Sequence, residues 1–137
     1  MSAFKFVSYA LDPSGTDWLP IDVFIRDSNH LERELNRLIA EKPKVIDFLA
    51  PNGDLLNLGI GGPVGYAAFA TSDMQSEGST VSANGTVNGD IPDWVEFEMG
   101  GTPTPINREG LVTAAELIAI ARYFFDTGGL HPGFSWE

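Results

Sequence analysis

The sequence contains no cysteine among its 137 residues. A disulfide framework, a Cys-ligated zinc ion and a thiol nucleophile are therefore excluded. It also lacks an apolar run of about 18 residues, the length that a membrane-spanning helix needs, so we expect no membrane contact. Residues 1–15 contain one lysine and no long apolar segment, which does not fit a signal peptide. These absences predict a cytoplasmic protein, most simply a bacterial one.

Basic residues are scarce and unevenly distributed. Eight Lys and Arg residues face nineteen Asp and Glu residues, which gives a net charge of −11. Residues 45–107 contain no Lys or Arg but eight acidic residues. Because phosphates would be repelled, we expect no nucleic acid as a partner, whereas a basic protein would be attracted. Acidity that serves only solubility is the alternative interpretation.

Residues that could support catalysis are few. His30 and His131 have no metal-ligand spacing, and no Gly-x-Ser-x-Gly motif presents a serine nucleophile. Glu96 and Glu98 could act as a carboxylate pair, because residues two apart on a strand share a face at roughly 7 Å, a separation that glycosidases use. Such a pair on a strand is more often a solvated surface. We therefore predict no enzymatic activity, no cofactor and no metal, with a small hydrolase-like enzyme as an alternative.

A glycine-rich segment, LNLGIGGPVGYAAFA, occupies residues 56–70. It lacks the lysine of a phosphate-binding loop and the third glycine of the dinucleotide-binding motif. No helix is expected directly after it, although a phosphate cradle needs one. We interpret its glycines as turn residues between antiparallel strands.

Alternating apolar residues and turn signals predict a series of strands. The expected strands are 4–11, 18–27, 44–50, 54–60, 64–70, 94–99 and 133–137. Capping boxes at Asn29 with Glu32 and at Thr113 with Glu116 predict two helices, which run to about Lys42 and Asp126. Segment 71–93 is expected to form loose hairpins or a long surface loop, and segment 100–110 is expected to be a loop. The order of elements predicts a single domain, residues 1–137, with an α+β fold in which two main helices pack on a largely antiparallel sheet.

The segment WVEFEM, residues 94–99, separates its side chains onto two faces. Val95, Phe97 and Met99 are expected in the core. Trp94, Glu96 and Glu98 then lie together, facing solvent or a partner, and aromatic side chains are frequent anchors in protein interfaces.

The C-terminal block LVTAAELIAIARYFFDTGGLHPGFSWE, residues 111–137, combines a helix, a Thr127-Gly128 stop, Pro132 and a short strand that ends at Trp136. Together with the strand–turn–strand pattern of residues 56–70, it resembles immunity protein family 1 of bacterial polymorphic toxin systems. The resemblance covers roughly residues 30–137. The chain departs from the family pattern before the last helix, where it has no proline, and before the closing proline, where it has His131.

The resemblance implies a small cytoplasmic protein that binds and neutralises a cognate toxin domain as a 1:1 complex. The family is often paired with deaminase toxins that act on nucleic acid. Such a toxin carries a basic groove, and an acidic inhibitor can occupy that groove as a phosphate mimic. An acidic adaptor subunit is a further alternative. From the clustering of acids without basic neighbours we predict that the toxin-binding residues are Asp73, Glu77, Asp90, Asp93, Trp94, Glu96 and Glu98.

Overall fold

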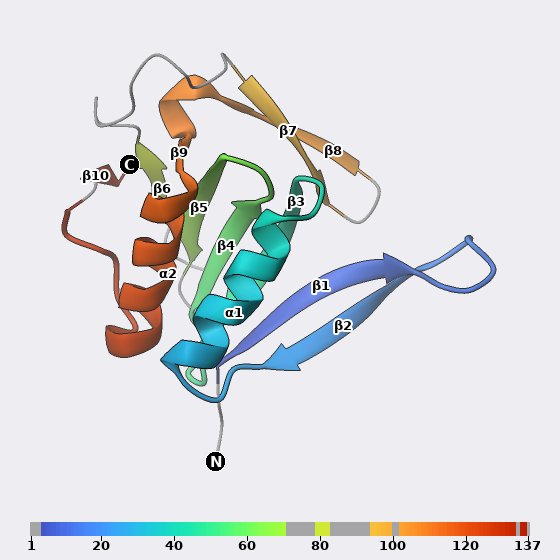
Figure 1. Ribbon diagram of the computed structural model, residues 1–137, viewed down its shortest axis with the longest axis horizontal. Coiled ribbons are helices and arrows are strands. Elements are labelled where there is room, and N and C mark those ends of the chain that lie inside the picture. Colours follow the sequence, from blue (N-terminus) through green and yellow to red (C-terminus); the bar gives the residue numbers. More distant parts are fainter. Residues whose placement is uncertain (1–3, 71–78, 83–93, 100–101, 134, 137) are drawn as a thin grey trace.

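The computed structural model describes residues 4–70, 79–82, 94–99, 102–133 and 135–136. These residues form an α+β fold in which two helices pack side by side on one face of an antiparallel sheet (Figure 1). The predicted fold class is confirmed. Neither helix in the described part of the chain has the length and apolar content needed to cross a membrane.

The main sheet of the described residues has eight strands. In chain order they are β1 (Lys5–Leu11), β2 (Trp18–Phe24), β3 (Lys44–Leu49), β4 (Leu55–Ile60), β5 (Val64–Ala70), β6 (Ser79–Ser82), β7 (Trp94–Met99) and β8 (Thr102–Asn107). The two-residue strands β9 (Val112–Thr113) and β10 (Ser135–Trp136) pair with β5 and β6. The spatial order is β10-β6-β5-β4-β3-β1-β2, and β7 joins β3 in parallel at one residue pair and carries β8 on its other side.

The first helix, α1 (Ser28–Ile39), begins and ends earlier than predicted. Its N-cap is Asp27, whose carboxylate accepts a hydrogen bond from the His30 N–H at 2.8 Å. The predicted capping box at Asn29 and Glu32 is therefore wrong, because Asp27 already caps the helix two residues upstream. The helix ends at Ile39 with Ala40 as its C-cap, and Pro43 follows three residues after the cap, where it disfavours helical geometry at Lys42.

The second helix, α2 (Ala114–Thr127), confirms its predicted start. The Thr113 hydroxyl accepts from the Glu116 N–H, and the Glu116 carboxylate accepts from the Thr113 N–H. Gly128 ends the helix in the left-handed conformation at φ 77°, which glycine adopts without a steric penalty.

The glycines of residues 56–70 have two different roles. Gly61 and Gly62 have positive φ angles and form the turn between β4 and β5, as predicted. Gly59 and Gly65 instead lie inside strands and are buried, so interpreting them as turn residues is wrong. A Cβ at Gly59 would collide with the ring of Tyr66, which is paired with it across β4 and β5.

Strand β8 lies in the segment 100–110, for which the sequence predicts a loop. Its two prolines are compatible with the hydrogen-bond ladder between β7 and β8. The reason is the direction of the Glu98 N–H, which points away from β8 and donates to the Pro43 carbonyl on the side of β3. Glu98 and its cross-strand partner Pro103 therefore form a non-hydrogen-bonded pair of this ladder. Pairs of this type recur every two residues, so Glu96 and Pro105 form another. The backbone nitrogens of both prolines, which carry no hydrogen, consequently face the outer edge of β8, where a strand tolerates proline.

The core has two parts, one on each face of the sheet. The larger lies under the helices, where Phe48 and Phe124 pack with ring centroids 5.4 Å apart. The smaller lies on the opposite face, where Tyr66 packs edge-on against Phe97 with centroids 5.3 Å apart. Because the inner face of β7 is held in this second core, its outer face is turned to solvent.

Candidate protein-binding surface

The structure describes three of the seven predicted toxin-binding residues. Trp94, Glu96 and Glu98 are exposed on the outer face of β7, as the alternation of the sequence predicts. Trp94 is 57% exposed, whereas Phe97 between the two glutamates is fully buried. The other four predicted residues lie outside the described residues; they are Asp73, Glu77, Asp90 and Asp93.

Two prolines of β8 complete this face. Glu96 pairs with Pro105, and Glu98 pairs with Pro103. Directly opposite residues of an antiparallel pair point to the same side of the sheet, so each glutamate lies beside a rigid apolar ring. We call the surface formed by Trp94, Glu96, Glu98, Pro103 and Pro105 the acidic hairpin face.

One end of the acidic hairpin face is hollowed. A pocket of about 260 Å³ is lined by Lys42, Pro43, Glu96, Glu98 and Pro103. Pro43 contributes because the Glu98 N–H binds its carbonyl oxygen at 3.2 Å. The walls of the pocket therefore come from two segments that are far apart in the sequence, the connection between α1 and β3 and the hairpin β7–β8.

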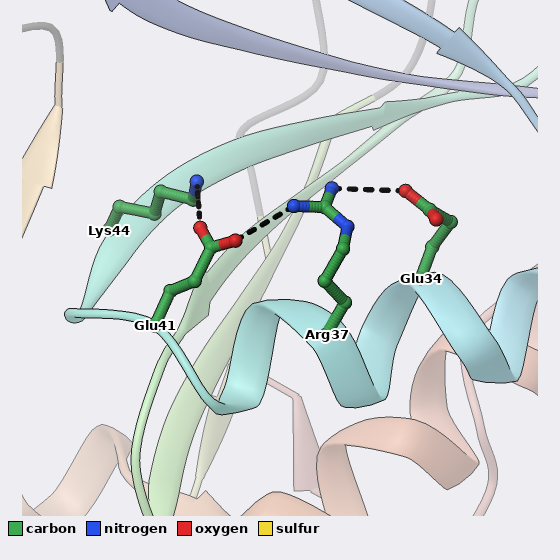
Figure 2. A network of polar contacts seen from close by, with 4 residues as sticks. All are labelled: Glu34, Arg37, Glu41 and Lys44. Atoms are coloured by element: carbon green, nitrogen blue, oxygen red, sulfur yellow. Dashed lines mark hydrogen bonds and ion pairs between the residues drawn. The ribbon is translucent and has the colours of Figure 1, made fainter.

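A network of ion pairs extends from the last turns of α1 to the start of β3. Arg37 bridges Glu34 at 3.0 Å and Glu41 at 2.7 Å, and Lys44 binds the other oxygen of Glu41 at 2.8 Å (Figure 2). The hydrogen bond to Glu34 raises the pKa of Arg37, and the hydrogen bond from Lys44 lowers the pKa of Glu41. Arg37 and Lys44 are thus engaged by acids from the same part of the chain.

Two further ion pairs lie outside this network. Lys5 pairs with Asp22 within the β1–β2 hairpin, and Arg122 of α2 pairs with Glu32 of α1. Among the described residues, no ion pair includes Glu96 or Glu98. The acidic hairpin face therefore presents carboxylates that α1 and the N-terminal hairpin do not neutralise.

A chain of polar side chains lies on the same side of the sheet as the second core. The Tyr66 hydroxyl donates to Asn57 at 3.1 Å, and Asn57 donates to Asp47 at 2.6 Å. Burial, with a contribution from the charge of Asp47, raises the pKa of Tyr66 to about 12. Tyr66 is 5% exposed, so this chain supports the packing beneath β7 rather than a surface site.

The two histidines take part in local backbone contacts. His30 Nδ1 accepts from the Arg26 N–H at 3.1 Å, and His131 Nδ1 accepts from the Gly133 N–H at 2.9 Å. Within the described ranges, no three His, Asp or Glu side chains are grouped so that they could hold a metal ion.

Sequence reasoning missed the two pocket residues that come from outside the hairpin. Lys42 and Pro43 lie at the end of α1 in the sequence, and no local pattern connects them with residues 94–99. Only the pairing of β7 with β3, at Lys44 and Glu98, brings them together. The prolines of β8 were assigned to a loop, so their position beside the glutamates was not predicted either.

Comparison of the chain with protein-family models, with curated proteins and with solved structures finds no match. The resemblance to immunity protein family 1 stays a prediction.

Proposed function

We propose that this protein is an immunity protein that binds a basic cognate toxin domain as a 1:1 complex and neutralises it in the bacterial cytoplasm. The observation that carries the proposal is the acidic hairpin face, where Glu96 and Glu98 flank a buried Phe97 and have no ion partner among the described residues. An exposed tryptophan on the same face supplies an aromatic anchor of the kind found at the centres of interfaces.

The chemistry of the face suits a partner that handles nucleic acid. Such a partner holds phosphates in a basic groove, and two carboxylates on a rigid strand can take the place of those phosphates. The resemblance of residues 56–70 and 111–137 to immunity protein family 1 supports a deaminase toxin as that partner. The net charge of −11 would speed the encounter with a basic domain.

The geometry favours binding over catalysis by the carboxylate pair. Acid–base catalysis by two carboxyl groups needs different surroundings for each, so that one is protonated and the other ionised. Glu96 and Glu98 are both exposed and each lies opposite a proline, so the structure gives no such contrast in burial between them. An acidic adaptor subunit remains the second alternative and differs in expecting no basic partner.

A growth-protection experiment tests the proposal. The toxin domain encoded beside this gene is expressed in a bacterial host, with and without the full chain. We expect the chain to restore growth, and a catalytically inactive toxin gives the growth level without intoxication. Continued growth arrest with the full chain present in soluble form would overturn the proposal.

A further inference from the structure

We infer that the acidic hairpin face binds an arginine side chain of its partner between Glu96 and Glu98, and that docking there proceeds through side chains rather than through an added strand. This inference rests on the proposed function, because it takes the partner to be a basic protein. It goes further by naming the contact residue of the partner and the mode of contact.

The edge of β8 is unsuited to strand addition. The Glu98 N–H points toward Pro43, so the backbone groups of Pro103 and Pro105 point outward, away from β7. Proline has a backbone carbonyl but no N–H, so at both positions an incoming strand would find an acceptor and no donor. Proline at a free edge is a recognised means of preventing edge-to-edge pairing.

Strand β2 is the last strand at the other end of the sheet that the described residues form, and its outer edge is protected in the same way. The Ile25 N–H donates to Phe4 of the neighbouring segment, which places the backbone groups of alternate residues, including Pro20, on the outer side. The outer edges of β8 and β2 therefore each contain proline at a position where a partner strand would need an N–H donor. Recognition at the β7–β8 hairpin is left to the side chains of its outer face.

The pocket at the end of this face fits a planar cation. Glu96 and Glu98 supply the carboxylates, and Pro43 and Pro103 supply rigid apolar walls within a volume of about 260 Å³. A guanidinium group has five donors in a fixed plane, is weakly hydrated and packs well on flat apolar surfaces. A bidentate pair with a carboxylate is also stronger than a single hydrogen bond.

Lys42 makes the pocket selective for arginine over lysine. Lys42 lines the same pocket as the two carboxylates, so its positive charge lies near them, although it forms no ion pair with either among the described residues. A second ammonium group would gain little over the one already present, because each acts as a point charge. A guanidinium group compensates for the repulsion with several hydrogen bonds in a defined geometry. Removal of the Lys42 charge should therefore strengthen the binding of either cation.

The test is a nuclear magnetic resonance titration of the full chain with N-acetyl-arginine-amide. We expect saturable shifts of the β7 amides and of the Trp94 indole N–H. N-acetyl-citrulline-amide, the citrulline compound, has nearly the same shape but no charge and should leave these chemical shifts unchanged. The variant Glu96→Gln/Glu98→Gln should weaken the arginine compound about tenfold or more, the equivalent of one charge-assisted hydrogen bond. Lys42→Ala should bind it more tightly than the wild type.

A matched control removes two acids elsewhere. Asp17→Asn/Asp126→Asn changes the net charge by the same amount at exposed positions on other elements and should bind like the wild type. Equal shifts with the citrulline compound, or equal weakening by the control, would overturn the arginine site. Such a failure leaves the growth-protection result intact, so the inference and the proposed function are judged separately.

Discussion

The backbone N–H of Glu98 donates to the carbonyl oxygen of Pro43 at 3.2 Å. This bond ties β7 to the start of β3 and brings Pro43 and Lys42 beside the glutamates of the hairpin. It also decides which way the prolines of β8 face. This one contact thus positions the pocket, and it leaves the outer edge of β8 without an N–H donor at Pro103 and Pro105.

The prolines of β8 should keep the protein from pairing edge to edge. Pro103→Thr/Pro105→Thr restores two N–H donors on the outer edge, so we expect association that increases with concentration. Light scattering after size-exclusion chromatography measures it. Pro51→Thr, in the exposed turn between β3 and β4, is the control and should leave the mass unchanged. The same mass for the double variant and the wild type at every concentration would contradict this explanation.

Strand β8 also shows where local sequence patterns stop being informative. TPTPIN contains two prolines and follows two glycines, and both residue types are typical of loops. Whether proline is compatible with a strand depends on which side its missing donor lies, and that depends on the partner strand. By contrast, β3 and β4 were predicted from local features alone, because Asn52 and Gly53 form a turn whose chemistry is complete within a few residues.

The capping box of α2 should contribute measurably to stability. Thr113→Ala removes the acceptor for the Glu116 N–H and half of a reciprocal pair, so we expect a loss of about 1 kcal/mol in the free energy of unfolding. Urea denaturation followed by circular dichroism measures it. Thr102→Ala, at an exposed position of β8, is the control and should change stability by less than about 0.5 kcal/mol. Equal losses in the two variants would argue against the cap.

Gly59 should be intolerant of any side chain. A methyl group there would collide with the Tyr66 ring, which packs against Phe97 beneath the acidic hairpin face. We expect Gly59→Ala to lower the free energy of unfolding by about 1–3 kcal/mol, as overpacking does. Gly129→Ala, where a methyl group meets only ordinary contacts, is the matched control. A wild-type denaturation midpoint for Gly59→Ala would mean that the ring is not held over the glycine.

Tyr66 should make the protein lose stability in strong base. Its pKa is raised to about 12, chiefly by burial, whereas a tyrosine in the unfolded chain titrates near its ordinary value of 10.0. Between these values the unfolded state has released the proton and the folded state retains it, so the free energy of unfolding falls as pH rises.

The variant Tyr66→Phe isolates this contribution. It loses the hydrogen bond to Asn57, so we expect about 1 kcal/mol less stability at neutral pH. Between pH 10 and 12 its stability should fall less steeply than that of the wild type, by at most about 1.4 kcal/mol per pH unit. Parallel curves for the two proteins across that range of pH would contradict the raised pKa.

The candidate surface was predictable in part. The alternation of residues 94–99 placed Trp94, Glu96 and Glu98 on one exposed face, because a strand has a period of two and Phe97 must be buried. The pocket could not be predicted, since Lys42 and Pro43 reach it only through the parallel contact of β7 with β3. Charge composition revealed a surplus of acids, but only the ion pairs of α1 and the N-terminal hairpin show which acids are already balanced.

The central claim is that Glu96 and Glu98 contact a basic toxin domain. Calorimetric titration of the full chain with the toxin domain encoded beside its gene, at two salt concentrations, tests it most directly. We expect 1:1 binding that weakens as salt increases, a large loss of affinity for Glu96→Gln/Glu98→Gln, and wild-type affinity for Asp17→Asn/Asp126→Asn. Equal affinity for the two double variants and the wild type would show that the acidic hairpin face is not the binding surface.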